Sequence, residues 1–515
     1  MPDENRPQLI LEVAFGVSNP LTVPASNQWT DISAYLRTDD LSIRRGRPDE
    51  LSPYAAGTAV FTLENGDGRF DPLNNTSPYH PNVVPMRRVR LRAVWSNTAY
   101  TLFTGFAQAW TPTYDPLVGQ AITTLRCTDM IGALLAHVPF NDVVVYDGPW
   151  GTTSDADLLG SFFNWQPPQG VFWGDRKVKV SVHAGGEAAS GSLTIHGTTS
   201  AGVTTTDLVA WLTTSGDTST TPQVLESNFA WREITRIRIR PRTVTSGNAG
   251  QAEIRVETSD YPSESSGDAA KRILDAVGVD ANEREVLVPS TIVPNWSPGG
   301  SATAHSLLQR LATGEQGFYY VNAAGVVIFH GRSWRWLGGI SPGITLSAST
   351  VPFSNLRLRY DEKFLYPVVR VARQGGTVQE ARDSTLATTY GPRTLEINNL
   401  LIENDNEAAA YADALLYRYK HPRIRIEQIE LQGELARPGT WSALLAVDIG
   451  TFVRVATIPP GSVALDQNVF VEQIALTIRG NEWRWVWNTS PGDADLIDFW
   501  VLEVDALDSS ARLAF

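Results

Sequence analysis

The chain has 515 residues, a formal net charge of −13 at pH 7, 42% hydrophobic residues and 19% charged residues. This composition is typical of globular proteins and excludes an extensively disordered chain, and the length predicts three or four domains of about 100 to 200 residues each. The negative charge disfavours nonspecific binding to duplex DNA, because neutralised phosphates drive that affinity. We interpret the charge as a source of solubility, with an acidic surface past which DNA slides as the alternative.

Cysteine content and the N-terminus exclude several further classes. Cys127 is the only cysteine, so an intrachain disulfide or a thiolate metal cluster cannot form. Residues Met1 to Arg6 are polar and mixed in charge, unlike a secretory signal, and no apolar run is long enough to span a bilayer. We therefore expect no membrane segment, and exit from the cell by another route such as lysis.

Residues 1–140 are rich in predicted β-strands. β-Branched and aromatic runs alternate there with Gly, Pro and Asn, which predicts short strands and a β-barrel-like domain. One run alternates Arg88, Arg90 and Arg92 with apolar residues, so the arginines should share one face of a strand. The predicted strands cover residues 9–15, 41–44, 59–63, 88–95, 100–106 and 121–127.

A fixed loop is predicted after the strand that ends near Leu63. Asn65-Gly66 favours the positive φ angles of a tight hairpin turn, so the chain should reverse there. Pro72 and Pro78 restrict their own φ angles and those of the preceding residues, which holds the following chain extended. The loop is therefore expected to be rigid.

The same loop has the outline of a partial calcium site. Asn65, Asp67 and Asp71 place oxygen-bearing side chains at alternate positions. Arg69, however, stands where a further ligand would be, and no glutamate closes the loop at the twelfth position. We therefore predict a turn without a metal ion.

Five short motifs occur in order within residues 29–105: Trp29-Thr-Asp31-Ile32-Ser33, Arg45-Gly46-Arg47, Gly66-Asp67-Gly68-Arg69-Phe70-Asp71-Pro72, Ser77-Pro78-Tyr79 and Phe103-Thr-Gly105. Together they resemble the start of minor tail proteins of long-tailed bacteriophages, such as those infecting actinobacteria or similar hosts. In that family this region builds a small β-barrel of the tail-tip hub, which resembles a baseplate hub. The resemblance implies a virion component.

Residues 141–262 differ in amino-acid composition from the preceding region and are expected to form an inserted domain. Ser-, Thr- and Gly-rich strands predicted at residues 177–182, 191–195, 207–212 and 234–239 favour a β-sandwich. Aromatic residues in its loop-like segments are candidates for glycan contact, and packing at the domain seam is the alternative. These candidates are Tyr146, Trp150, Trp165 and Trp173.

Residues 263–340 are expected to form a module of two helices and a hairpin. Apolar residues at helical spacing predict a helix from Asp268 to Val277, with Ser266 as its cap and Gly278 as its stop. The same spacing predicts a second helix that begins at Ala304 and is ended by Gly314.

A predicted hairpin at residues 317–329 follows these helices. Glu315-Gln-Gly317 before it and Gly325 in its turn resemble a recurring step of the same tail family. The resemblance therefore extends beyond the first region into the middle of the chain.

Residues 341–490 are expected to form a second β-barrel-like domain that contains a helix from Asp405 to Lys420. Asn404 and Glu407 form a variant of a capping box at the start of this helix. Its strands are predicted at residues 356–360, 367–372, 424–431, 451–456, 469–478 and 482–487. The tail, residues 491–515, mixes aromatic and acidic residues, and we expect it to dock on its own barrel or on a neighbour.

The residues with catalytic or binding chemistry are few. Trp483, Trp485 and Trp487 should share one face of a strand, where aromatic core or a subunit contact is favoured over sugar stacking. Cys127 has no activating base nearby in the sequence, which favours a buried structural thiol over a nucleophile. We predict no catalytic residue, no cofactor and no metal, although carboxylate pairs for glycoside hydrolysis can come from distant segments.

The fold class is predicted to be mainly β with a few helices: two β-barrel-like domains, a helix and hairpin module and an inserted β-sandwich. As the resemblance implies, the chain would be a homotrimeric structural hub at the virion tail tip, assembled in the host cytoplasm. Two related barrels per subunit would then make a pseudo-sixfold ring. The residues expected to organise a barrel loop or a subunit seam are Arg45, Arg47, Asp67, Arg69, Phe70 and Asp71.

The implied partners are a distal tail or tail tube protein, the tape measure protein, and tail fibres or receptor-binding proteins. DNA would pass through the channel without specific binding. Three alternatives stay open: a distal tail ring protein, a receptor- or glycan-binding tail protein, and a cell-wall polysaccharide hydrolase.

Overall fold

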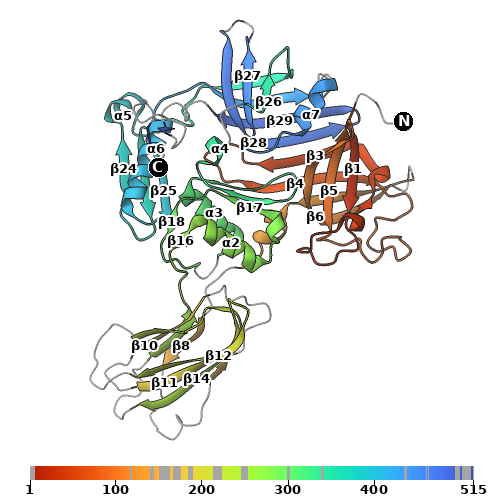
Figure 1. Cartoon of the computed structure of the whole chain (residues 1–515). Helices are drawn as coiled ribbons and strands as arrows, with labels where there is room; N and C mark the ends of the chain where they lie inside the picture. The colour runs from red at the N-terminus through yellow and green to blue at the C-terminus, as the bar shows by residue number, and fades with distance from the viewer. Residues whose placement is uncertain are drawn as a thin grey trace.

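The computed structural model describes most of the chain: residues 6–115, 117, 119–139, 144–149, 163–165, 176–183, 189–212, 223–244, 253–298, 302–337, 342–433, 438–459, 461, 463–492, 499–500 and 512–513. The fold is mainly β with a few helices, as predicted (Figure 1). We call the strands β8 to β15, Val144 to Thr258, the insert, and the remaining described residues the body. Figure 1 shows the insert suspended from one side of the body.

One 13-stranded sheet runs through the body and joins two strand-rich halves. The first half contains, in spatial order, β2 (Thr30–Asp31), β1 (Gln8–Val13), β5 (Arg88–Trp95), β6 (Thr98–Asp115), β7 (Gln120–Thr128), β4 (Ala55–Glu64) and β3 (Leu36–Gly46). The second half continues with β28 (Leu465–Arg479), β29 (Glu482–Pro491), β26 (Arg425–Gln432) and β22 (Asn355–Arg359), while β27 (Phe452–Thr457) pairs with β28 and β21 (Ile344–Leu346) pairs with β27.

The described strands of the two halves share one open sheet, whereas two β-barrel-like domains were expected. β3 pairs antiparallel with β28 from Gly46 opposite Gln473 to Leu41 opposite Ile478, so the strands of both halves share one ladder. Among the described strands the sheet does not close. The strand pattern of the sequence fixes which side chains face inward, but it does not specify which strand lies beside which.

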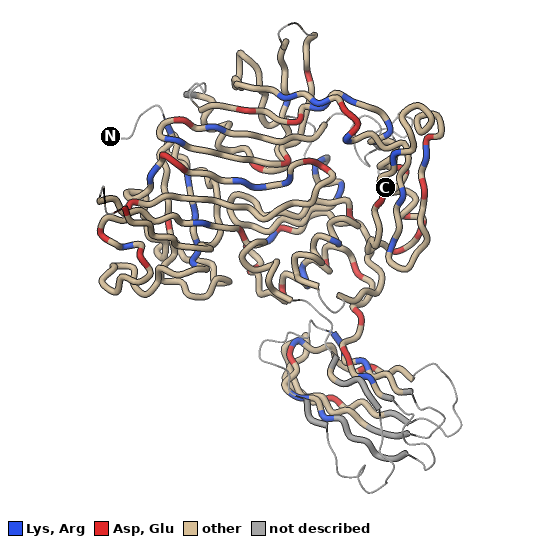
Figure 2. Tube along the Cα trace, turned by 180° about the vertical axis from the view of Figure 1, so that it is seen from behind, with Lys and Arg blue, Asp and Glu red and all other residues tan. Residues whose placement is uncertain are grey.

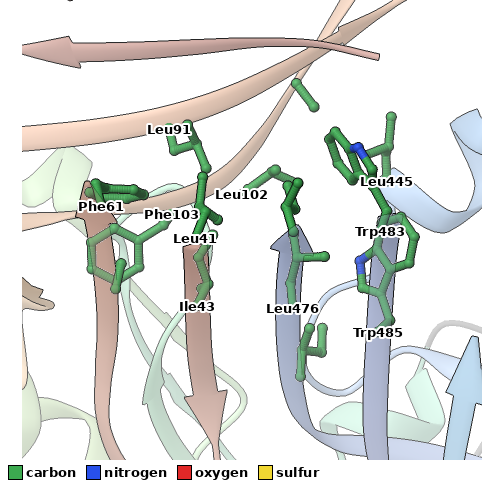
Figure 3. Packing of buried hydrophobic residues seen from close by; sticks show 14 of the residues in the cluster. Leu41, Ile43, Phe61, Leu91, Leu102, Phe103, Leu445, Leu476, Trp483 and Trp485 are labelled. Carbon is green, nitrogen blue, oxygen red and sulfur yellow. The ribbon is translucent and has the colours of Figure 1, made fainter. Parts of the chain in front are cut away.

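A continuous hydrophobic core crosses the boundary between the halves. Figure 3 shows Leu41 and Ile43 of β3 beside Leu476 of β28, with Phe61 on one side and Trp483 and Trp485 on the other. Trp483, Trp485 and Trp487 are 4%, 3% and 0% exposed, which confirms aromatic core over a sugar platform. Trp441 of α7 (Trp441–Leu445) packs against Trp483 and Trp485 with ring centroids 5.5 and 5.8 Å away.

The insert is a β-sandwich, as predicted. Its two four-stranded sheets enclose a separate apolar cluster that includes Val180, Ile195, Trp231 and Val256. One sheet has the order β13 (Gln223–Glu226), β10 (Val178–His183), β15 (Glu253–Thr258) and β8 (Val144–Pro149). The other has the order β12 (Thr204–Leu212), β11 (Ala189–Thr199), β14 (Trp231–Val244) and β9 (Phe163–Trp165).

The predicted helix pair is present, with small differences at the ends. α2 (Ser266–Val277) is capped by Ser265 rather than Ser266, and Gly278 stops it with a φ of 86°. α3 (Ala304–Glu315) runs past Gly314, because Gln316 adopts the left-handed conformation that ends the helix. Beside them lie β16 (Glu264–Ser265) with β18 (Ile292–Val293), then β17 (Arg284–Leu287), β20 (Val327–His330) and β19 (Phe318–Val321), and α4 (Trp334–Leu337).

The predicted second barrel loses one of its strands to a separate small sheet. β23 (Val368–Arg373) pairs with β24 (Gln379–Arg382) and β25 (Thr394–Leu400), and α6 (Asp405–Tyr419) packs on it. The parallel pairing of β23 and β25 requires a crossover, which contains α5 (Ser384–Tyr390). As predicted, Asn404 caps α6, because its Oδ1 accepts a hydrogen bond from Glu407 N at 3.0 Å.

Charged residues of both signs are interspersed along the body in Figure 2, which favours the interpretation of the net charge as solubility.

Short elements complete the described chain. The tail, residues 491–515, lies mostly outside the described residues, and within it β30 (Phe499–Trp500) pairs with β31 (Arg512–Leu513). The turns of 3-10 helix are Ser26–Gln28, Ser33–Tyr35, Ala281–Glu283 and Pro438–Thr440, and Ile131–Leu135 is a π-helical turn.

Candidate functional site

Two of the predicted assembly residues lie where the halves of the sheet meet. Gly46, between Arg45 and Arg47, has a φ of 103°, and a Cβ atom there would lie 2.1 Å from the carbonyl oxygen of Glu472. Glycine is therefore required for the close approach of β3 to β28. The register of β28 against β29 shifts between Val471 and Gln473, so Glu472 sits at an irregularity of its strand.

Glu472 is the centre of a buried ionic cluster. Its side chain is 0% exposed and accepts hydrogen bonds from Arg47 Nε at 2.8 Å and Arg335 Nη1 at 2.7 Å. Tyr54 Oη and Ser490 Oγ donate two more, at 3.0 and 2.6 Å. Burial opposes ionisation of this carboxyl, but attraction and hydrogen bonding from Arg335 and Arg47 outweigh it and hold its pKa well below the usual range.

A second ion pair lies beside the first. Arg45, 5% exposed, donates from Nη1 to Asp448 Oδ1 at 2.6 Å. The other oxygen of Asp448 accepts from Ala323 N at 2.9 Å, in the turn between β19 and β20. We call Arg45, Arg47, Arg335, Asp448 and Glu472 the junction, since their contacts tie both halves of the sheet to the helix and hairpin region.

The guanidinium groups of the junction also lie on aromatic rings. The Arg47 guanidinium carbon is 4.4 Å from the centre of the Tyr54 ring, and that of Arg335 is 4.0 Å from the centre of Phe318. Such cation–π contacts stabilise a desolvated cation. The junction therefore combines ion pairing, hydrogen bonding and stacking in one water-poor site.

The other predicted assembly residues lie on the loop after β4, which is not the predicted hairpin. β4 pairs with β3 and β7, and the next strand begins only at Arg88. Gly68 rather than Gly66 has a positive φ, of 69°. We call residues 65–80 the turn ladder, because at every third residue a backbone N–H donates to the carbonyl three residues before it: Gly68 to Asn65, Asp71 to Gly68, Asn74 to Asp71, Ser77 to Asn74 and His80 to Ser77.

Phe70 anchors the turn ladder to the sheet. Its side chain is 0% exposed, and its ring lies 5.5 Å from Tyr35, 5.7 Å from Tyr79 and 6.1 Å from Trp110, centre to centre. Arg69 covers the Tyr35 ring at 3.9 Å. Successive turns replace the extended chain predicted after Pro72 and Pro78, and one buried ring holds the loop against the sheet. The rigidity of the loop stays a prediction.

The side-chain oxygen atoms that resemble calcium ligands accept hydrogen bonds from other groups of the protein. Asn65 Oδ1 accepts from Phe70 N at 2.9 Å, and Asp67 Oδ2 accepts from Arg69 Nε at 2.8 Å. Asp71 Oδ2 accepts from Tyr114 Oη at 2.6 Å. Within the described ranges, no group of three or more His, Cys, Asp or Glu residues has the arrangement of a metal site.

The six predicted assembly residues thus fall in two places: Arg45 and Arg47 in the junction, and residues 67–71 on the turn ladder. A role at a subunit seam stays a prediction for both. Sequence reasoning missed Glu472, Arg335 and Asp448. A charged residue inside the apolar run Val469-Phe470-Val471-Glu472 was the one local signal for a buried ion pair.

The Glu315-Gln-Gly317 step also has a structural use. Glu315 is 0% exposed and accepts hydrogen bonds from Thr291 N at 2.8 Å and Ser266 Oγ at 2.7 Å. A Cβ at Gly317 would lie 2.3 Å from the carbonyl oxygen of His330. The step therefore joins the end of α3 to the start of α2 and to β20.

Tyr146, Trp165 and Cys127 lie in β-strands of the insert and of the first half. Tyr146 belongs to β8 and Trp165 to β9, which lie in opposite sheets of the insert, whereas Trp150 and Trp173 lie outside the described residues. Cys127 is 1% exposed, and burial raises its pKa well above the usual value, as expected for a structural thiol.

In the part of the chain that the structure describes, no helix has the length and apolar character to cross a membrane.

Comparisons with known proteins find similarity in three dimensions alone. No protein-family model matches the chain, and no curated protein matches it. The tail protein from Neisseria meningitidis MC58 superposes with a TM-score of 0.49 at 11% identity, over 94% of this chain and 97% of that one. The 43 kDa tail protein of prophage MuSo2 from Shewanella oneidensis gives 0.43 at 12%, over 94% and 99%. These TM-scores are too low to assign the chain to a family or a function.

Proposed function

We propose that this chain is a structural subunit of a bacteriophage tail tip, where it forms a hub between the tail tube and the fibres or receptor-binding proteins. The ordered motifs of the first region, which resemble phage minor tail proteins, support this role. The observation that carries the proposal is the pairing of β3 with β28, reinforced by the buried junction. It makes two strand-rich halves one rigid unit.

Two strand-rich halves joined in one sheet could both face the channel of a ring. Each half contributes a long antiparallel pair to the shared ladder, β3 with β4 and β28 with β29. Three copies would place six strand-rich halves around one axis, matching a hexameric tube on one side and threefold fibres on the other. In this proposal DNA passes through the channel without specific contacts, and the chain catalyses no reaction.

We propose a separate role for each region of the chain. Residues 1–140 and 341–490 are the two ring-forming regions, residues 263–340 connect them, and residues 491–515 are a docking tail. The insert within residues 141–262 extends away from the body, as Figure 1 shows, so we propose that it faces the fibres, the receptor-binding proteins or a cell-surface glycan. The ring would contact the distal tail or tube protein and the tape measure protein.

Native mass spectrometry of the purified chain tests the oligomer directly. A hub predicts a species of three times the 56.4 kDa chain. A sixfold species would favour a distal tail ring protein instead. A monomer that binds cell-wall glycan through the insert would favour a receptor-binding protein, and release of reducing ends from such glycan would reveal a hydrolase.

A further inference from the structure

An open apolar groove lies beside the junction. Its cavity volume is about 460 Å³, and it is lined mainly by Leu287, Val288, Trp334, Phe452 and Phe470, with Arg335 and Gly450. Leu287 and Val288 are each 43% exposed. The volume is in the usual range for binding pockets.

The walls of the groove are held in place by the body. The Phe452 and Phe470 rings lie 4.9 Å apart, and the Arg335 guanidinium covers Phe470 at 4.5 Å. Trp334 lies against Gly450, where a Cβ atom would be 3.1 Å from Cζ3 of the indole. The groove is therefore formed before anything binds, which lowers the entropic cost of binding.

Arg335 places positive charge at one wall of the groove. Its Nε atom is buried and has no hydrogen-bond partner among the described residues, while its Nη1 shares the carboxylate of Glu472 with Arg47. Two guanidinium groups around one carboxylate leave positive charge beside the apolar walls. An occupant with both apolar and acidic side chains would match this surface.

The chain itself supplies such a segment at a suitable place. After β29 the backbone passes Gly492, whose N–H donates to Asn468 O at 2.8 Å, and a Cβ atom at Gly492 would be only 2.5 Å from Cε2 of Phe452. The tail therefore begins in contact with a residue that lines the groove. Phe499 is seven residues further on, a span of at most about 25 Å when extended.

The composition of the tail fits the groove. Residues 493–515 contain six acidic residues and one basic residue. Their apolar residues include the run Phe499-Trp-Val-Leu502, which is followed at once by Glu503. Aromatic side chains bury about 150 to 250 Å² each and are typical anchors in apolar pockets.

We infer that the groove is the docking site of this chain's own C-terminal segment, centred on Phe499 to Leu502. The inference does not depend on the proposed role in a phage tail. Docking covers Leu287 and Val288 and places acidic residues of the tail near Arg335. A tail from a second copy and an unrelated ligand are the competing occupants.

Disulfide trapping in the full-length chain tests this inference. Val288→Cys with Val501→Cys places one thiol in the groove and one in the tail, while the native Cys127 is buried. Val463→Cys with Val501→Cys is the matched control. Val463 is 81% exposed, lies between β27 and β28 outside the groove, and is five residues from Asn468.

Mild oxidation should give an intrachain disulfide at least about tenfold faster in the Val288 pair than in the Val463 pair, because docking raises the local thiol concentration. Adding Leu287→Glu should slow the Val288 pair by about tenfold or more, while Val463→Glu should leave it unchanged. Equal rates in the two pairs, or no disulfide in either, would overturn the inference. Dimers linked through Val288→Cys and Val501→Cys would assign the groove to the tail of a second copy.

Discussion

Arg47 and Glu472 are 425 residues apart in the sequence, yet Arg47 Nε lies 2.8 Å from Glu472 Oε2 in the interior of the protein. The backbone repeats the contact, because Arg47 N donates to Glu472 O at 2.9 Å. This pair closes the seam between the first and second halves of the sheet.

Replacing Glu472 with glutamine should strongly destabilise the body. The substitution leaves Arg47 and Arg335 buried without their shared carboxylate, and breaking a buried ion pair costs about 3–5 kcal/mol. Thermal unfolding followed by circular dichroism should show an earlier first transition. Asp466→Asn, which removes an exposed ion pair with Arg454, is the control and should change the transition little. Similar shifts in both variants would contradict a stabilising junction.

The contribution of Glu472 should depend on pH with a defined sign. Its pKa is lowered well below its usual value of 4.5 in the folded protein, so its stabilisation is fully present above about pH 4.5. It should be lost as the pH falls further towards the folded pKa. The difference in melting temperature between the wild type and Glu472→Gln should therefore be constant from pH 8 to pH 5 and shrink below that.

The test compares melting temperatures between two proteins because the pKa of another buried acid, Asp129, is shifted in the opposite direction. Desolvation raises the pKa of Asp129 to about 6, although backbone N–H groups of Gly57, Gly132 and Ile131 oppose the shift. The folded state therefore binds this proton before the unfolded state does, and stability from this group rises as the pH falls through 6. Asp129 is present in both proteins and cancels. A difference that grows on acidification would refute the assignment for Glu472.

Gly46→Ala should weaken the seam through the backbone. The residue has a φ of 103°, and the added Cβ would meet Glu472 O, so a cost of about 1–3 kcal/mol is expected. Gly66→Ala is the matched control, because nothing lies within 4 Å of its Cβ position and its φ is not positive. Denaturant unfolding followed by tryptophan fluorescence compares the two. An equal loss in both variants would argue against a close approach at Gly46.

The turn ladder is predicted to act in assembly. Arg69→Ala removes the contacts with Asp67 and Tyr35, and Asp71→Ala removes the hydrogen bond from Tyr114. Each should reduce the fraction of trimer in native mass spectra while the monomer keeps its melting temperature within a few degrees. Asn75→Ala, an exposed position of the same loop, should assemble normally. Normal trimers from both variants would remove the turn ladder from the assembly surface.

Local features of this fold were predictable from the sequence because they depend on neighbouring residues. The helical spacing from Ala270 to Val277, the stop at Gly278 and the cap at Asn404 all appear in the structure. Alternation of Trp483, Trp485 and Trp487 correctly indicated one buried face. In each case a period or a backbone preference acts over a few residues.

The features of the fold that were not predicted depend on contacts between distant segments. Nothing local to β3 indicates that its outer edge pairs with β28, and this contact converts two expected barrels into one sheet. Gly314 did not end α3, because it packs against the backbone of Leu401 inside the helix. Glu472 stands out only by the apolar residues before it, and nothing around Arg335 in the sequence marks its charge. The two residues become a site only when folding removes them from water.

Electron cryomicroscopy of an assembled tail tip would show directly whether this chain forms the ring. We expect three copies of the chain around the channel, with the β3–β28 seam intact in each and six strand-rich halves facing the end of the tail tube. Six copies in the ring, or density for this chain only outside the tail axis, would contradict the proposal.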